Sequence, residues 1–265
     1  MPEGDNLFRA ATALRKALRG SRVAAFHSNV PLVLRSLEER PLEGAHVESV
    51  EARGKHLLVG FDDGRILHTH LRMSGSWHLY RKGERWRRPE RNARAALETD
   101  GGLVAVCFDA PVVELTTAFG LRGLDRLGPD ATTDAFDAAE ALRRLRARGD
   151  LPVGEALLSQ RALAGVGNVI KAEALFSCRE DPFQRVDAIP DVRLARLLGE
   201  AHRLLVENRE GGPRTSRRAL SGPRLWVYGR SGKRCLECGA TVRMRRQGVM
   251  GRSTYYCPRC QGVAS

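Results

Sequence analysis

The sequence lacks the features that mark a membrane or secreted protein. No apolar run approaches the ~20 residues that a helix needs to cross a bilayer. No positively charged start leads into a hydrophobic segment, so we do not expect a secretory signal. The chain also has no internal repeat and no low-complexity tract, and 42% hydrophobic with 28% charged residues is a globular composition. We therefore expect a folded cytoplasmic protein without membrane contact.

Acidic residues are in short supply. The 265-residue chain has 31 Asp and Glu against 44 Lys and Arg, which leaves a formal net charge of +13. An excess of this size points to a polyanionic partner, and nucleic acid is the usual one. A basic ribosome-like or storage protein would share this charge, so charge alone does not decide the function.

Cysteine is also scarce, and most of it lies near the C-terminus. Cys235 and Cys238 form one CxxC pair, and Cys257 and Cys260 form a second pair 18 residues later. Two such pairs suit one tetrahedral zinc ion, and two disulfides are the alternative. We favour zinc because cytosolic thiols stay reduced. Four protein ligands leave no open position for a substrate, so the zinc would be structural.

The hydrophobic pattern changes along the chain. It predicts an amphipathic helix over residues 7–19, short strands and hairpins over 45–120, and four helices over 134–148, 152–162, 169–176 and 192–207. We therefore predict an α+β multidomain protein: a β-sandwich or barrel with a flanking helix, then a helical domain and a finger. The predicted boundaries are 1–128, 129–225 and 226–265.

Two segments are candidates for contact with an anion. Residues 81–94 form a basic loop around Trp86, which we interpret as a solvated surface loop in preference to a DNA contact. Residues 163–168 read Leu-Ala-Gly-Val-Gly-Asn between two helical patterns. The glycines permit a tight turn, and the next helix offers its N–H groups to a phosphate. Asn168 would cap that helix or bind the phosphate, but a generic helix–helix turn fits equally well.

The chain begins Met-Pro-Glu-Gly, which suggests a nucleophile. Removal of the initiator methionine would expose the secondary amine of Pro2. An α-amine has a pKa near ~8, against ~10.4 for a lysine, so more of it is free base at neutral pH. A free amine can attack an electrophilic sugar carbon and form an iminium, and Glu3 beside it can move protons. Such starts are common, so the rest of the chain must decide.

An ordered set of motifs runs along almost the whole chain. They are MPEG at 1–4, RGKHLL at 53–58, HLRMSG at 70–75, LGPD at 127–130, LAGVGN at 163–168, EALF at 173–176, VYGR at 227–230 and GRSTYYCPRC at 251–260. Together they resemble the bacterial family of formamidopyrimidine-DNA glycosylase and endonuclease VIII, which are DNA glycosylase/AP lyases. No single motif is specific, but the complete series in this order is.

The resemblance implies an architecture and a partner. It implies an N-terminal β-sandwich with flanking helices, a helix–two-turn–helix domain with Asn168 at its phosphate-binding turn, and a zinc-stabilised β-hairpin with Arg252 at its tip. The partner would be double-stranded DNA with an oxidised base or an abasic site. The enzyme would act as a monomer at the bacterial nucleoid, and one structural Zn²⁺ would be its only cofactor.

The resemblance also implies four catalytic residues. Pro2 matches the Schiff-base nucleophile that attacks C1′ of the damaged nucleotide. Glu3 matches the acid that helps to open or protonate the sugar. Lys55 matches the lysine that binds phosphate and assists β-elimination. Arg252 matches the finger arginine that binds the phosphates flanking the lesion and assists δ-elimination.

Five further residues match DNA contacts of the family. His70 and Asn168 match phosphate contacts, and Arg126 matches an endonuclease VIII contact. Arg72 and Met73 match the segment that fills the gap left by the extruded base. A stacked base must be extruded before attack, and an inserted side chain offsets part of the unstacking cost. An unbranched Met suits an irregular gap, and ordinary strand core is the alternative interpretation that we favour less.

Several positions bear on the branch of the family. Gly4, the RGK at 53–55 and the short arginine-rich segment 207–226 favour endonuclease VIII, whose members excise oxidised pyrimidines. Met73-Ser74-Gly75 resembles the formamidopyrimidine branch, which acts on oxidised purines, so that specificity is the alternative.

Two departures of this sequence from the family pattern leave a third hypothesis about function open. Arg72 stands where better-known endonuclease VIII enzymes have Gln. Asp5-Asn6 replaces the Pro-Glu of many members, which removes a carboxylate near the site. A non-catalytic zinc-finger protein that binds damaged DNA is therefore the hypothesis from a different functional class.

Overall fold

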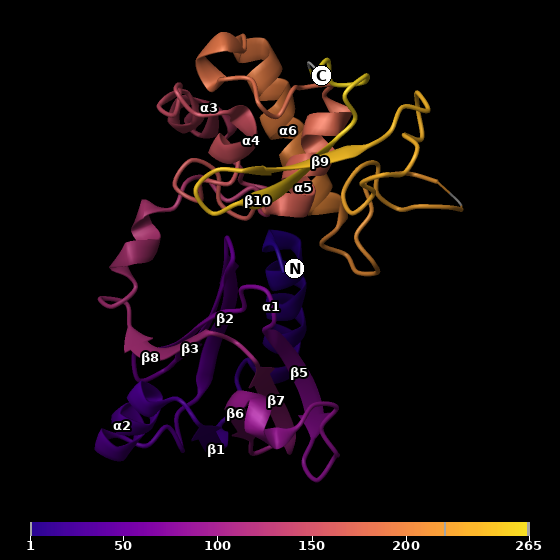
Figure 1. Cartoon of the computed structure of the whole chain (residues 1–265). Coiled ribbons are helices and arrows are strands. Elements are labelled where there is room, and N and C mark those ends of the chain that lie inside the picture. The colour runs from indigo at the N-terminus through magenta and orange to yellow at the C-terminus, as the bar shows by residue number, and fades with distance from the viewer. Residues whose placement is uncertain (1, 220, 264–265) are drawn as a thin grey trace. The chain divides into compact units, whose positions relative to one another are not determined.

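The structure is a computed structural model that describes residues 2–219 and 221–263. The chain divides into two compact units, one ending at Arg126 and the other beginning at Leu127 (Figure 1). Each unit has its own hydrophobic core. Among the described residues, no helix combines the length and the apolar character needed to span a membrane. The three domain boundaries predicted from the sequence stay predictions.

The first unit contains two antiparallel four-stranded sheets, with strand orders β1-β6-β7-β5 and β2-β3-β4-β8. Its elements are α1 (Gly4–Leu18), β1 (Val23–Ser28), α2 (Pro31–Glu39), β2 (Val47–Arg53), β3 (His56–Phe61), β4 (Arg65–His70), β5 (Ser76–Arg81), η1 (Glu90–Asn92), β6 (Ala93–Thr99), β7 (Leu103–Phe108), β8 (Val112–Thr117) and η2 (Arg122–Arg126). The main core takes residues from both sheets, and this confirms the β-sandwich with a flanking helix.

The core of the first unit follows from alternation along the strands. Leu57 and Val59 of one sheet and Leu97 and Ala105 of the other are buried in a single cluster. Because side chains alternate across a strand, the neighbours of these four residues within each strand point to the opposite face of the sheet. One side of α1 packs on the same cluster through positions at helical spacing, beginning at Leu7.

The basic loop between β5 and β6 is attached by its tryptophan. The Trp86 ring lies 6.2 Å from Tyr80 and 5.7 Å from Phe108, centroid to centroid, on the outer face of the β1-β6-β7-β5 sheet. Arg85 and Arg87 on either side of it are exposed. The loop therefore has an aromatic anchor and a solvated charged surface.

The second unit is mainly helical and ends in a β-hairpin. Its elements are α3 (Ala138–Arg146), α4 (Val153–Ala156), α5 (Asn168–Ser177), η3 (Val186–Ala188), α6 (Asp191–Glu207), β9 (Arg243–Gln247) and β10 (Arg252–Tyr256). Its main core lies among the helices, and a smaller cluster joins α5 to the cysteine-bearing finger. In Figure 1 the hairpin of β9 and β10 crosses beside α5, and β10 contacts that helix.

The predicted helix over residues 152–162 is wrong in extent. Only Val153–Ala156 is helical, and two turns follow before α5. The Gln160 side chain closes this segment: its Nε2 donates to the carbonyls of Leu158 and Val166, and its Oε1 accepts the N–H of Gly165. A side chain that takes backbone partners in this way competes with helix continuation. The sequence pattern gave no sign of these tertiary bonds.

Candidate active site

Pro2 and Glu3 lie at the start of α1. Pro2 is half-buried, and Glu3 is completely buried at the N-cap with extended backbone angles of φ −124° and ψ −175°. The Glu3 carbonyl accepts the N–H groups of Asn6 at 3.0 Å and Leu7 at 3.2 Å. The positive end of the α1 dipole therefore lies at Glu3, directly after Pro2.

Asn6 explains part of the departure at positions 5 and 6. Its Oδ1 accepts the Glu3 N–H at 3.3 Å, which gives it the reciprocal capping role at the third position of the helix. Asp5 is completely buried in the first helical turn. The helix begins at Gly4, earlier than the predicted residue 7, because the polar residues Glu3 and Asn6 form this start.

Lys55 lies in the turn between β2 and β3. Arg53 ends β2 and pairs with His56, which begins β3, so Gly54 and Lys55 form a two-residue hairpin connection. Gly54 has a φ of +59°, a conformation that two-residue hairpins require and glycine adopts without strain. Lys55 is thereby presented at the end of a hairpin, half-buried.

The segment after β4 is tightly wound and projects its side chains outward. The Gly75 N–H donates to the Leu71 carbonyl at 2.9 Å, and a Cβ at position 75 would lie 2.7 Å from that oxygen, so only glycine fits. Arg72 has a φ of +45°, which is uncommon for a residue other than glycine. Met73 is 63% exposed, so its interpretation as strand core is wrong.

His70 is the last residue of β4 and is neutral at physiological pH. Burial lowers the pKa of His70 to about 4, with further lowering by the Arg72, Lys55 and His68 charges. Its Nδ1 accepts the Arg72 backbone N–H at 3.2 Å. The proton of the neutral ring is therefore on Nε2, which makes that atom a hydrogen-bond donor.

The first unit carries seven of the predicted site residues. Arg126 is exposed and is the last residue of the 3-10 helix η2. Within this unit, Lys55 and His70 are near neighbours, since the lysine charge acts on the histidine. The full set in this unit is Pro2, Glu3, Lys55, His70, Arg72, Met73 and Arg126.

In the second unit, Asn168 does not cap α5. Gly167 is the N-cap, and Asn168 is the first helical residue. Its Nδ2 donates to the Ser253 carbonyl at 2.6 Å and to the Ser253 Oγ at 3.0 Å. The side chain therefore joins the glycine turn to the finger hairpin. Arg252, the neighbour of Ser253, is exposed at the first position of β10. Asn168 thus contacts the strand that begins with Arg252.

A buried lysine supports this junction, and sequence reasoning missed it. Lys171 is completely buried, and its Nζ donates to Thr254 Oγ1 at 2.8 Å. That hydroxyl donates to Gln247 Oε1 at 2.8 Å, and the Gln247 amide donates to the Pro182 carbonyl at 2.9 Å. Two charged residues, Lys171 and Glu173, inside a mostly apolar helix were the available signal, because buried charges need fixed partners.

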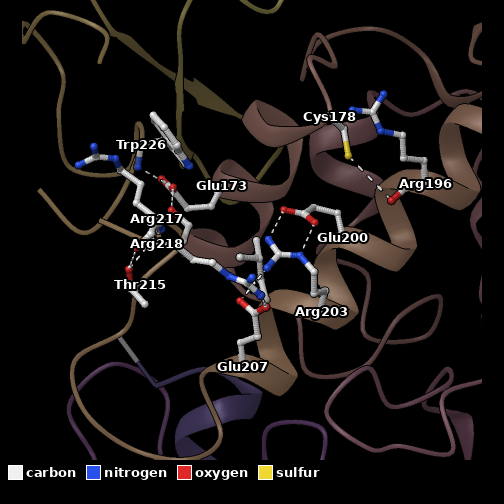
Figure 2. Close-up of polar contacts among 12 residues, drawn as sticks. Glu173, Cys178, Arg196, Glu200, Arg203, Glu207, Thr215, Arg217, Arg218 and Trp226 are labelled. Carbon is white, nitrogen blue, oxygen red and sulfur yellow. Dashed lines mark hydrogen bonds and ion pairs between the residues drawn. The ribbon is translucent and has the colours of Figure 1, made fainter. Parts of the chain in front are cut away.

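Glu173 was also missed, and it anchors the chain that leads into the finger. Its carboxylate is completely buried and accepts the backbone N–H groups of Trp226 at 2.7 Å, Val227 at 3.0 Å and Tyr228 at 2.8 Å. The Ser216 hydroxyl donates to the same carboxylate. Figure 2 shows Glu173 beside Trp226 and the arginine-rich connection. One side chain thus fixes two distant segments on α5.

The arginine-rich connection after α6 is short and held at its base. Asn208 exchanges two bonds of 2.8 Å with the backbone of Thr215. Arg218 donates to Glu207 at 2.6 Å, and Arg203 reaches the same carboxylate at 2.6 Å (Figure 2). The connection is therefore fixed to the end of α6.

The four C-terminal cysteines form one cluster. Their sulfur atoms all lie within 4.8 Å of one another, with 3.8 Å between Cys235 and Cys260 and 3.4 Å between Cys238 and Cys257. Disulfide sulfurs would be ~2.05 Å apart. Four thiolates at ~2.3 Å from a tetrahedral zinc ion stand roughly 3.8 Å apart. The residues fit one structural zinc, and the disulfide alternative is wrong.

Three segments of the chain match models of known protein families. Residues 1–111 match the model of the formamidopyrimidine-DNA glycosylase N-terminal domain, and residues 127–218 match its H2TH domain. Residues 232–263 match the zinc finger found in FPG and IleRS. The chain therefore belongs to the family of formamidopyrimidine-DNA glycosylase and endonuclease VIII. It is a DNA glycosylase and AP lyase of base excision repair.

Particular relatives refine this class. The chain is 41% identical to a probable endonuclease 8 2 of Streptomyces coelicolor, over 98% of this chain and 94% of the relative. It is 36% identical to the DNA-(apurinic or apyrimidinic site) lyase Nei2 of Mycolicibacterium smegmatis, over 98% and 99%. The MutM (FPG) structure of Thermus thermophilus matches with a TM-score of 0.80 and 30% identity over both complete chains. The Lactococcus lactis Fpg bound to N7-benzyl-Fapy-dG DNA matches with a TM-score of 0.82 and 25% identity, over 98% and 99%.

Proposed function

We propose that this enzyme excises oxidised pyrimidines from double-stranded DNA and cleaves the strand by β,δ-elimination. The observation that carries the mechanism is the position of Pro2, directly before the buried Glu3 and at the positive end of α1. The helix dipole favours the uncharged amine, which is the nucleophilic form.

The reaction begins at the sugar. The Pro2 nitrogen attacks C1′ and gives up its proton to the damaged base, which leaves with the electrons of its bond to C1′. Glu3 donates a proton to the sugar oxygen O4′ as the ring opens, and the product is an iminium between Pro2 and C1′. Glu3 is suited to this role because it adjoins Pro2 and its backbone is fixed by the capping bonds of α1.

The iminium then permits strand cleavage. Loss of a C2′ proton expels the 3′ phosphate, and a second elimination expels the 5′ phosphate. Lys55 binds phosphate and assists the first elimination, and Arg252 binds the phosphates flanking the lesion and assists the second. His70, Asn168 and Arg126 contribute further phosphate contacts.

Extrusion of the damaged base requires a side chain that replaces it. Met73 is 63% exposed on the tightly wound segment after β4, and Arg72 beside it adopts a positive φ. An exposed, unbranched side chain on a fixed turn is suited to insertion into a base stack. We assign Met73 to the gap and Arg72 to the opposite strand.

The preference for pyrimidines rests on two observations. The curated relatives with 36% and 41% identity bear the name endonuclease 8 2 or Nei2. The connection after α6 is short and fixed at its base, so it does not supply the long loop that covers oxidised guanine in the formamidopyrimidine branch. The Met73-Ser74-Gly75 segment, which resembles that other branch, supports oxidised purines as the second candidate.

The same proposal covers the setting of the enzyme. A repair glycosylase of bacterial type works on the nucleoid in the cytoplasm, and the set of site residues within one chain needs no second copy. We therefore propose a monomer, which sedimentation or gel filtration of the zinc-loaded protein would measure.

Borohydride trapping tests the mechanism and the lesion preference together. The mature protein is incubated with labelled duplexes that carry thymine glycol, 8-oxoguanine or an abasic site. We expect a covalent adduct that depends on Pro2 and forms faster with thymine glycol than with 8-oxoguanine. Pro2→Gly should retain DNA binding and lose most strand cleavage, and Arg9→Gln on the same helix serves as a control.

The remaining outcomes select the alternatives. Faster trapping with 8-oxoguanine would support the purine branch. A fully active Pro2→Gly protein would contradict the nucleophile. Salt-sensitive binding with no adduct on any duplex would support the non-catalytic binder of damaged DNA.

A further inference from the structure

Three histidines and a glutamate form a row across the outer face of the β2-β3-β4-β8 sheet. His56 of β3 stands opposite His70 of β4, and His68 of β4 stands opposite Glu114 of β8. The rings of His56 and His68 are stacked with centroids 5.1 Å apart, and those of His56 and His70 meet edge to face at 4.8 Å. The row therefore ends at a proposed DNA contact.

Two hydrogen bonds join the row and fix its tautomers. The His68 Nδ1 lies 3.0 Å from Glu114 Oε2, and the His68 Nε2 lies 2.8 Å from the His56 Nδ1. A carboxylate only accepts, so the His68 Nδ1 carries a proton. In a neutral His68, Nε2 then accepts, so the His56 Nδ1 donates. With His68 neutral, the His68 and His56 rings therefore each have a single hydrogen-bond arrangement.

Burial, together with the neighbouring charges, keeps the His56 and His70 rings neutral. Burial lowers the pKa of His56 to about 3, with further lowering by His70, His68 and Lys55. Arg53 stands opposite His56 in β2, and its charge is paired with Asp125 at 3.7 Å. A lysine and two neutral rings are therefore held side by side near pH 7.

This arrangement has a consequence for the His70 ring. Its Nδ1 is occupied by the Arg72 N–H, so its Nε2–H is the group that remains to donate outward. The His56 ring, fixed through His68 and Glu114, packs edge to face against it and limits its rotation. Nothing in the packing of the core requires this polar row, because the core lies on the other face of the sheet.

We propose that Glu114, His68 and His56 are positioning residues that hold the His70 ring as an oriented, uncharged donor to the DNA phosphate. This inference rests on the proposed function, in which His70 and Lys55 contact phosphate. In this proposal Lys55 provides the positive charge that attracts the phosphate, and His70 provides a hydrogen bond of fixed orientation. A neutral donor releases no counterion, so the row should affect affinity without affecting the salt dependence of binding.

A double-mutant cycle tests the connection through His70. The affinity of the zinc-loaded protein for a duplex with a tetrahydrofuran abasic analogue is measured for wild type, His68→Leu, His70→Ala and the double variant. We expect His68→Leu to weaken binding about tenfold, the scale on which orienting partners act. The double variant should bind no more weakly than His70→Ala alone, and the salt slope should stay unchanged.

His46→Leu is the matched control. His46 forms a 3.1 Å pair with Asp62 in the same unit, but it is exposed and lies outside the row. It should bind like wild type. Additive losses in the cycle, or equal losses in the control, would overturn the inference. A wild-type protein that does not bind the duplex would contradict the proposed function itself and overturn this inference with it.

Nitrogen NMR of labelled imidazoles gives a readout that needs no DNA. At neutral pH we expect His68 to be protonated on Nδ1 and His70 on Nε2. Glu114→Gln, at a half-exposed side chain that the fold does not need, should change the tautomer populations of His68 and His56 because an amide also donates. Unchanged spectra in this variant, or a His70 proton on Nδ1, would overturn the inference even if DNA binding is normal.

Discussion

The two units present their proposed site residues in different ways. In the first unit these side chains come from a chain start, a two-residue turn and a tightly wound segment, where local backbone geometry fixes Pro2, Lys55 and Met73. In the second unit Asn168 and Arg252 are placed by buried polar bonds between a helix and a finger. Replacing a reactive residue of the first unit should therefore cost activity, whereas replacing a supporting residue of the second should cost stability.

Loss of a zinc ligand should have the largest effect on the second unit. Structural zinc contributes about 10 kcal/mol or more to the folding of small zinc domains. Cys257→Ser should therefore lose zinc, unfold the finger and weaken DNA binding, while the first unit stays folded. Zinc content and limited proteolysis measure this. Cys178→Ser, at a buried thiol outside the cluster, should retain zinc. An intact finger in Cys257→Ser would contradict the role of zinc in holding the finger of the second unit.

Loss of the buried Glu173 carboxylate should have the next largest effect on the stability of the second unit. Glu173→Leu leaves the backbone N–H groups of residues 226–228 without their acceptor, and each such group costs about 1–3 kcal/mol. We expect at least about 3 kcal/mol of destabilisation in urea unfolding. Glu207→Gln, at a partly exposed carboxylate paired with Arg203 and Arg218, should cost about 1 kcal/mol or less (Figure 2). Equal losses would contradict the distinction between the two carboxylates.

The stability of the first unit should depend on pH through His56 and His70. The pKa values of His56 and His70 fall from the ordinary 6.5 to about 3 and about 4 on folding. Between these limits the unfolded chain binds more protons, so stability falls as the pH is lowered below about 6.5. His56→Gln should reduce this slope, as urea midpoints between about pH 7 and pH 4.5 would measure. The same slope in both proteins would contradict the assignment.

Met73→Ala should have the smallest effect on stability. Met73 is 63% exposed, so the free energy of unfolding should change by no more than about 0.5 kcal/mol. Excision from a stacked duplex should nevertheless slow, because nothing would fill the gap left by the base. Single-turnover excision and urea unfolding separate the two effects. A large loss of stability with normal excision would reverse the expected pattern.

Sequence reasoning succeeded where the signal was local or ordered along the chain. The spacing of the two CxxC pairs predicted the zinc cluster, and the strand patterns predicted the β3–β4 and β6–β7 hairpins. It was wrong about the end of the helix after Pro152, because the bonds of Gln160 involve residues that a periodicity does not relate. It missed Lys171 and Glu173 for the same reason.

By itself, the sequence determined the family, the order of the parts and the residue types available for catalysis, because motifs, charge and periodicity are properties of neighbours along the chain. Only the tertiary structure decided which side chains meet. The row of His56, His68 and Glu114 depends on strand register, and the Asn168–Ser253 contact joins residues 85 positions apart. Such pairings follow from the packing of whole elements, which no local pattern encodes.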